Sequence, residues 1–116
     1  MGLLLGIDVG TTSLKTALFS ADGHCLSIQR EEYSLDTPSV EKAQLDPHFY
    51  WEACVRTIHA LLNCVSCNSN DIAALAVSSQ GETLITLDAH GEPLYPAIVW
   101  LDNRASMQAE KLAKKF

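Results

Sequence analysis

The segment Leu5–Lys15, which reads LGIDVGTTSLK, determines the expected fold of this chain. It contains the end of a continuous apolar run, Leu3–Ile7, and such a run suits a strand that is buried on both faces. Asp8–Thr12 has the composition of a turn, and a second apolar stretch, Leu14–Phe19, follows at once. Because a parallel crossover needs a dozen or more residues, these two strands are expected to pair antiparallel.

The next elements extend this pattern into a mixed α/β fold. Asp22-Gly23 is a strong hairpin signal, and the alternation over residues 26–31 predicts a third strand of a meander with one wet face. Asp46-Pro47 predicts a helix start, with a capping carboxylate followed by a proline at the first helical position. The apolar stripe of this helix is expected to consist of Trp51, Cys54, Val55, Ile58, Leu61, Leu62 and Val65.

Further strands and a second helix are predicted beyond residue 71. Residues 72–77 suit another buried strand, and residues 83–87 are expected to form one more. Residues 93–100 are apolar but contain Pro96, so they are expected to be extended and edge-like. Residues 104–115 have helix-forming composition, with Met107, Leu112 and Phe116 as apolar members. The order of these strands and helices along the chain predicts a sheet with an antiparallel portion followed by a covered parallel portion.

Length and charge restrict the classes of protein. The 116 residues suit one domain, 1–116, and a net charge of −6 argues against nucleic-acid binding. The basic cluster Lys111, Lys114 and Lys115 is interpreted as the solvated face of the last helix. No stretch approaches the about 20 apolar residues of a membrane span, and the amino terminus lacks the features of a signal peptide.

The cysteines and histidines indicate a reducing compartment. Cys64 and Cys67 have the CxxC spacing of a redox pair or of half a zinc site, but there is no second ligand pair. Together with Cys25 and Cys54 they are interpreted as free thiols, which favours the cytoplasm. The four histidines share no spacing with carboxylates and are interpreted as structural or exposed.

The turn after the first strand carries residues that suit phosphate chemistry. A carboxylate at a strand end, Asp8, can hold Mg²⁺, and Gly10 lets a phosphate approach the backbone. Thr11 and Thr12 can donate to phosphate oxygens, while Lys15 can offset charge on a transferred phosphoryl group. The same residues also suit an ordinary tight hairpin. The spacing matches neither a Walker A loop nor a Rossmann fingerprint.

Four ordered segments resemble the FGGY carbohydrate kinases, the family that holds xylulokinase, glycerol kinase and gluconokinase. Residues 5–15 are similar to the family's opening phosphate-binding segment, and Leu45-Asp46-Pro47 with Trp51 is similar to its Asp-Pro helix. Residues 77–83 resemble the segment in which glycerol kinases contact substrate hydroxyls. Residues 96–104 are similar to the family's Pro-Ala-Ile-x-Trp-x-Asp-x-Arg stretch, in its xylulokinase-like form. The resemblance covers essentially the whole chain.

The resemblance implies a role for each matching position. Asp8 would bind Mg²⁺, and the ATP phosphates would lie against Gly10, Thr11, Thr12 and Lys15. The sugar pocket would be lined by Gln80, Gly81, Glu82, Trp100, Asp102, Asn103 and Arg104. Two simpler interpretations stay open from the residues alone: an ion pair between Asp102 and Arg104, and a core position for Trp100. The general base is expected downstream of Phe116, so no catalytic residue is assigned within the chain.

The implied fold is the ribonuclease H-like fold of actin-like ATPases, a mixed sheet with flanking helices, here as an amino-terminal domain fragment without its carboxy-terminal domain. The implied activity of the full-length protein is ATP- and Mg²⁺-dependent phosphorylation of a sugar, ketose or polyol hydroxyl. One alternative is a non-catalytic nucleotide- or sugar-binding module of the same superfamily, and a more distant one is a hydrolytic ATPase of the actin and chaperone type. The chain alone is expected to be inactive, and its exposed faces favour self-association, for instance as a homodimer.

The sequence departs from the family's patterns at the substrate segment. Glycerol kinases carry Arg-Glu where this chain has Gly81-Glu82, and xylulokinases usually carry Met-His around position 81. The resemblance therefore indicates the class of substrate and no single sugar.

Overall fold

The computed structural model describes residues 2–116, which form two compact units. The first unit combines the chain up to Tyr33 with His48–Gln80, and the second combines Ser34–Pro47 with Gly81–Phe116.

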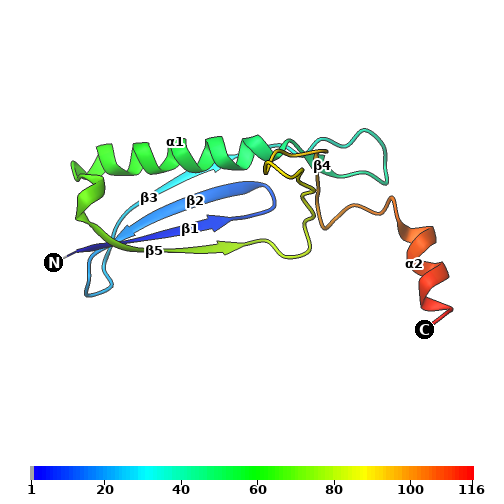
Figure 1. The fold of residues 1–116 in the computed structure, drawn as a ribbon. Helices are drawn as coiled ribbons and strands as arrows, with labels where there is room; N and C mark the ends of the chain where they lie inside the picture. The colour runs from blue at the N-terminus through cyan, green and yellow to red at the C-terminus, as the bar shows by residue number, and fades with distance from the viewer. Residues whose placement is uncertain (1) are drawn as a thin grey trace. The chain divides into compact units, whose positions relative to one another are not determined.

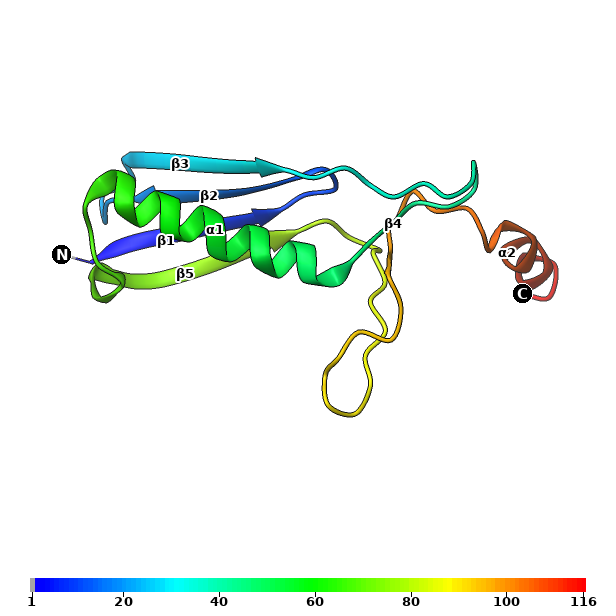
Figure 2. The ribbon, with the colours of Figure 1, turned by 90° about the horizontal axis from the view of Figure 1, so that it is seen from above.

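The first unit is built on a four-stranded sheet in the order β3-β2-β1-β5 (Figures 1 and 2). Its strands are β1 (Leu3–Val9), β2 (Ser13–Phe19), β3 (Cys25–Glu32) and β5 (Ile72–Ser79). The first three pair antiparallel, as the short turns between them require, and β5 pairs parallel to β1. The predicted meander followed by a parallel strand is confirmed. The expectation that β1 and β5 are buried strands was only partly right for β1 and wrong for β5, because Leu4 is exposed and every residue of β5 after Ile72 is exposed. The hairpin between β2 and β3 turns at Gly23, whose φ of 92° is in the left-handed region.

Helix α1 (Pro47–Val65) lies across one face of this sheet and begins at the predicted proline (Figure 1). Its buried residues, Ala53, Thr57 and Leu61, are four positions apart. The small side chains of Ala53 and Thr57 allow the helix to approach the sheet closely. Including Trp51 in the apolar stripe was wrong, because 70% of that side chain is exposed. The first unit's core is completed by alternate residues of two strands, Leu5 and Ile7 of β1 with Leu14, Thr16 and Leu18 of β2.

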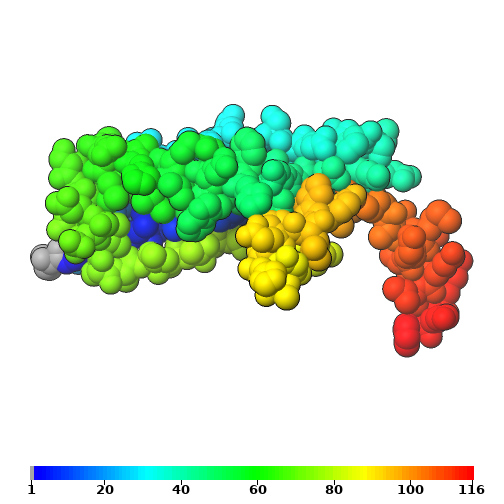
Figure 3. Space-filling model, turned by 45° about the horizontal axis from the view of Figure 1, so that its top comes forward, coloured from blue at the N-terminus to red at the C-terminus, as the bar shows by residue number. Residues whose placement is uncertain are grey.

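The face of the sheet opposite α1 is open and largely apolar. The register between β2 and β3 places Ile28 beside Ala17 on this face, and Ile28 is exposed. Arg30 lies beside Lys15 on the same face, whereas the intervening polar residues of β3 are less exposed. Figure 3 shows that α1, by contrast, covers much of the sheet on its own side. The solvent-exposed face of β3 therefore carries the apolar side chains of the strand together with Arg30.

The second unit has a smaller ordered core. Strands β4 (Gln44–Leu45) and β6 (Ala97–Ile98) pair antiparallel, and helix α2 is Ser106–Ala113. The buried apolar residues of this unit are Ala43, Leu45, Ala97 and Val99. The predicted terminal helix is confirmed, although Met107, Leu112 and Phe116 are all exposed.

The strand expected over residues 83–87 was wrong. This segment forms two isolated bridges, Leu84 with Ile98 and Leu87 with Pro93, and both connect it to the segment that returns after the turn at residues 88–91. The returning segment contains Pro93 and Pro96, which lack a backbone N–H donor, and a continuous ladder cannot form opposite them. Figure 2 shows the result as a narrow loop between β5 and β6 in the chain.

Within residues 2–116, no helix combines the length and the apolar character that crossing a bilayer requires. The cysteines are free thiols: Cys25 and Cys64 are exposed, and Cys54 and Cys67 are half-buried.

Candidate functional site

The turn between β1 and β2 has a geometry that only glycine fits at its first position. The Gly10 N–H donates to the Ser13 carbonyl at 2.9 Å, which closes the turn. A Cβ added at Gly10 would lie 2.7 Å from that carbonyl oxygen, closer than real side chains approach. A side chain at this position would collide with the Ser13 carbonyl, so the turn requires glycine here in order to close.

The carbonyl groups of this turn are held from the end of β3 and the end of β5. The Tyr33 hydroxyl donates to the Gly10 carbonyl, and the Tyr33 backbone N–H donates to the Thr12 carbonyl at 3.0 Å. The Gln80 side-chain amide also donates to the Gly10 carbonyl, at 3.1 Å, and its distance to the Tyr50 hydroxyl is 3.3 Å. Gln80 lies one residue beyond β5, and its backbone N–H donates to the Val9 carbonyl at 2.9 Å. The turn is therefore held by the side chains of two residues that directly follow other strands, Tyr33 after β3 and Gln80 after β5.

The two tyrosines of this cluster pack edge to face, with ring centroids 5.4 Å apart. Tyr33 is buried, and this burial, aided by the nearby Tyr50 and Asp8, raises the pKa of Tyr33 to about 12. Its hydroxyl consequently stays protonated at neutral pH and remains a hydrogen-bond donor to Gly10.

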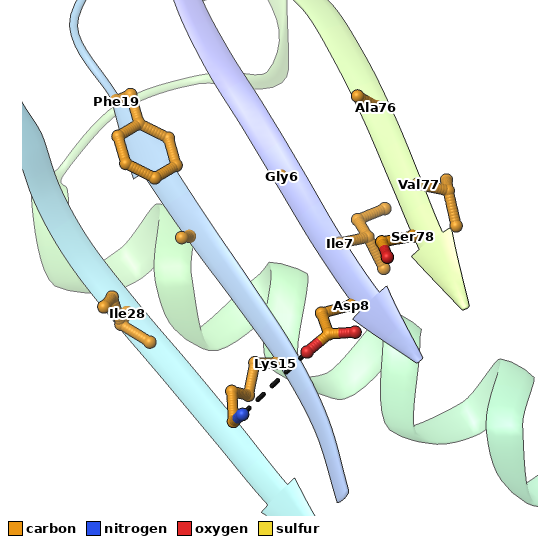
Figure 4. A pocket seen from close by; sticks show the side chains of 10 residues that line it. Gly6, Ile7, Asp8, Lys15, Phe19, Ile28, Ala76, Val77 and Ser78 are labelled. Atoms are coloured by element: carbon orange, nitrogen blue, oxygen red, sulfur yellow. Dashed lines mark ion pairs between the residues drawn. The ribbon is translucent and has the colours of Figure 1, made fainter. Parts of the chain in front are cut away.

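Asp8 and Lys15 lie side by side on the open face of the sheet (Figure 4). Their charged groups are 3.8 Å apart, and 53% of the Asp8 side chain is exposed. They form the polar end of a shallow cavity of about 400 Å³ whose remaining lining is mainly apolar, including Phe19 and Ile28. An exposed carboxylate with one loosely held partner keeps lone pairs for a hard cation such as Mg²⁺. The apolar part of the cavity is unsuited to a phosphate.

In the second unit, Asp102 and Arg104 form a closely bonded ion pair. The Asp102 carboxylate accepts from Arg104 Nη2 at 2.6 Å, from Nε at 2.8 Å, and from the backbone N–H groups of Arg104 and Ala43. Only 2% of the Asp102 side chain is exposed, against 20% for Arg104. The hydrogen bonds from Arg104 hold the pKa of Asp102 well below its usual range. The ion pair proposed from the residues is present, and it is buried on the aspartate side.

Arg104 extends this pair into a network. Its Nη2 donates to the Gln44 side-chain oxygen at 2.9 Å, and its Nη1 lies 3.4 Å from the Tyr95 hydroxyl. The guanidinium is also 5.8 Å from the centre of the Tyr95 ring, a cation–π distance. The network fixes the segment before β4 against the segment after β6.

The remaining residues expected at the sugar pocket are largely exposed. Trp100 is 50% exposed, which excludes the interpretation as a core residue, and its backbone N–H lies 3.4 Å from the Thr83 hydroxyl. Glu82 has a φ of 61°, which a residue with a side chain rarely adopts outside functional sites and turns. Asn103 is exposed and anchored through its backbone N–H to the Glu41 carbonyl at 2.8 Å.

In the first unit the structure pairs Asp8 with Lys15 and Gly10 with Gln80, and in the second it pairs Asp102 with Arg104. Four residues that hold these groups were missed by sequence reasoning: Tyr33, Gln44, Tyr50 and Tyr95. Local patterns did not indicate them, because Tyr33, Gln44 and Tyr50 contact residues that are distant in the chain. The available signal for Tyr33 was an aromatic residue at the end of a strand in an otherwise polar stretch.

Three comparisons place this chain among known proteins. Residues 3–116 match the model of the FGGY family of carbohydrate kinases, N-terminal domain. The chain is 31% identical over its whole length to the xylulose kinase of Staphylococcus xylosus, covering 24% of that protein. It is 36% identical over 95% of its length to the glycerol kinase of Nitrosomonas eutropha, covering 22% of it. The crystal structure of a gluconate kinase from Lactobacillus acidophilus superposes on 98% of this chain with a TM-score of 0.90 and 30% identity, over 23% of that protein. The chain therefore spans about a quarter of the length of the curated relatives it matches.

Proposed function

The chain belongs to the FGGY family of carbohydrate kinases, and we propose that the complete protein carrying it transfers a phosphoryl group from ATP to a hydroxyl of a sugar, ketose or polyol. The membership agrees with the sequence resemblance and with the actin-like ATPase fold of the structural relatives. The observation that carries the proposal is the turn at Gly10, which requires glycine in order to close and follows the exposed carboxylate of Asp8 by two residues. Phosphoryl transfer requires such positioning and charge stabilisation more than covalent chemistry.

The residues of the first unit fit a bound nucleotide with its metal ion. Gly10, Thr11 and Thr12 would hold the phosphates through backbone and hydroxyl donors. The exposed carboxylate of Asp8 would hold Mg²⁺, directly or through water, and Lys15 beside it would offset phosphate charge. The ion, when bound, supplies further neutralisation of phosphate charge.

In the second unit we assign direct sugar contact to residues whose side chains are exposed. Trp100 offers an aromatic wall for the apolar face of a sugar, and Glu82 and Asn103 offer polar groups for its hydroxyls. Asp102 and Arg104, expected at the same pocket, have their polar groups occupied by each other and by the backbone. Their contribution is to hold the Trp100 segment in place.

The proposed activity is tested by sugar-dependent ADP release from MgATP by the complete protein. The panel should contain xylulose, gluconate and glycerol, which are the substrates named for the relatives above. Turnover with at least one of these compounds is expected, and Asp8→Asn should reduce it strongly. Asp22→Asn, which removes a carboxylate from the exposed β2–β3 turn, is the matched control. Nucleotide binding without turnover on any of these or related compounds would instead support a non-catalytic binding module.

We further propose that residues 1–116 are part of a larger domain structure and are inactive alone. The open face of the sheet carries apolar side chains of β2 and β3, which folded proteins normally cover. The isolated chain should therefore release no ADP in the same assay, and it should self-associate in size-exclusion chromatography. Sugar-dependent turnover that copurifies with the isolated chain would overturn this proposal. The free thiols support a reducing, cytoplasmic location.

A further inference from the structure

We propose that Tyr33 and Gln80 are positioning residues that orient the peptide groups of the phosphate turn, an inference that rests on the proposed role of this turn in nucleotide binding. Both side chains donate to the same acceptor, the Gly10 carbonyl. Neither residue belongs to the turn: Tyr33 follows β3, and Gln80 follows β5. The turn is thus held by strands on both sides of the β1–β2 hairpin.

The planarity of the peptide bond explains how these contacts act on a ligand. In a trans peptide the C=O and the following N–H point in opposite directions, and no described residue has a cis bond. A donor that holds the Gly10 carbonyl therefore also fixes the direction of the Thr11 N–H. The Tyr33 backbone N–H holds the Thr12 carbonyl, which fixes the Ser13 N–H in the same manner.

The arrangement gives the turn a defined shape before any ligand binds. Glycine tolerates many backbone conformations, so Gly10 alone would let the turn rotate between orientations. Carbonyl oxygens have two lone pairs, and at Gly10 both find a donor, one from Tyr33 and one from Gln80. A turn that is already oriented loses less freedom when it binds a phosphate. The two side chains consequently raise nucleotide affinity without touching the nucleotide.

The first variants remove one donor each with little change in shape. Tyr33→Phe deletes the hydroxyl and keeps the ring that packs on Tyr50, whereas Gln80→Leu deletes the amide at similar volume. Gln108→Leu is the matched control, because it removes the same amide from the exposed surface of α2 in the second unit. If Gln80→Leu does not fold, Gln80→Asn, whose shorter side chain cannot span the same distance, replaces it.

The assay is isothermal titration of the complete protein with MgADP, accompanied by steady-state kinetics. One hydrogen bond biases the orientation of the turn by a factor of about 2 to 10, and the apparent affinity follows the population of the competent orientation. Each single variant should weaken MgADP binding by up to about tenfold. The double variant should weaken it by more than the product of the two, because it alone leaves the Gly10 carbonyl without a donor.

Two comparisons separate positioning from a general structural role. In the kinase assay Tyr33→Phe should raise KM for ATP while KM for the sugar stays the same, and Gln108→Leu should change neither. A double variant that binds MgADP within about twofold of the unsubstituted protein would overturn the inference. So would an unsubstituted protein that binds no MgADP. If that protein binds MgADP but phosphorylates no sugar, the proposed kinase activity fails, and the variant affinities still decide the inference.

Discussion

Replacing Asp102 by asparagine should loosen the segment before β4, and the hydrogen bonds of this residue indicate by how much. One carboxylate oxygen accepts from Ala43 N–H at 2.8 Å and from Arg104 Nη2 at 2.6 Å. The other accepts from the Arg104 backbone N–H at 3.0 Å and from Nε at 2.8 Å. Asparagine must place an NH₂ group at one of these oxygens. In either orientation it loses one backbone and one charged donor.

A hydrogen bond to a charged group contributes about 1.5–3 kcal/mol and a neutral one about 1 kcal/mol. Asp102→Asn should therefore destabilise this segment by about 2–4 kcal/mol, with the lower values favoured because the Arg104 side chain remains partly in water. Opening of the segment would become roughly 30-fold to several-hundred-fold more frequent.

Hydrogen–deuterium exchange of the complete protein measures this opening locally. The amide of Ala43, which donates to Asp102, should exchange faster by this factor in Asp102→Asn. Glu110→Gln, on the exposed surface of α2, makes the same change of charge and should leave Ala43 unaffected. Equal exchange at Ala43 in Asp102→Asn and in the unsubstituted protein would refute the view that this carboxylate holds the segment.

The same carboxylate predicts a dependence on pH. The pKa of Asp102 is lowered in the folded protein, chiefly by the hydrogen bonds from Arg104, so the folded state favours the charged form. Its contribution is complete above the unfolded pKa of about 4 and declines as the pH falls toward the lower folded pKa. The difference in Ala43 protection between the unsubstituted protein and Asp102→Asn should therefore shrink on acidification from pH 7 to about pH 3. A constant difference would contradict this account.

Other substitutions test the remaining parts of the site and core. Gly10→Ala should weaken MgADP binding at least about tenfold in calorimetry, since its Cβ would lie 2.7 Å from the Ser13 carbonyl oxygen; unchanged affinity would contradict the proposed role of this turn in phosphate binding. Asp8→Asn should lower kcat about 100-fold and raise the Mg²⁺ requirement in steady-state kinetics. Trp100→Ala should raise KM for the sugar about tenfold and leave KM for ATP unchanged. Thr16→Val should stabilise the protein by about 1 kcal/mol in urea denaturation, because the buried Thr16 hydroxyl has no hydrogen-bond partner within the described residues.

Local sequence signals predicted the elements of the first unit because each element is specified by neighbouring residues. The apolar runs predicted β1, β2 and β5, Asp22-Gly23 predicted the hairpin, and Pro47 predicted the start of α1. The stripe of α1 was partly wrong at Trp51, since periodicity identifies a face of the helix and not the width that the sheet covers. The strand at residues 83–87 was wrong for a similar reason: its pairing depends on the prolines of another segment.

The site residues could be predicted only where a motif contained them. The turn at Gly10 was identified from its own composition, but Tyr33 lies 23 residues away and Gln80 lies 70 residues away from it. No local spacing encodes such contacts, because they depend on how the ends of β3 and β5 meet the turn. Exposure was equally unpredictable: Trp100 belongs to an apolar segment next to the buried Val99, yet half of it is exposed.

Asp8 and Asp102 show why motif membership does not by itself define a ligand-binding carboxylate. Both residues end or follow an apolar stretch within a family motif, and from the sequence both are candidates for binding. A carboxylate can bind a cation or a sugar hydroxyl only through lone pairs that the protein has not already used. Asp8 has one partner at 3.8 Å and is half exposed, whereas Asp102 is almost fully buried and accepts from Arg104 and two backbone N–H groups. The cation should therefore bind at Asp8, while Asp102 should act through the backbone segments that it holds. Substitution of Asp8 should alter catalysis without altering the protection of backbone amides from exchange. Substitution of Asp102 should primarily reduce that protection.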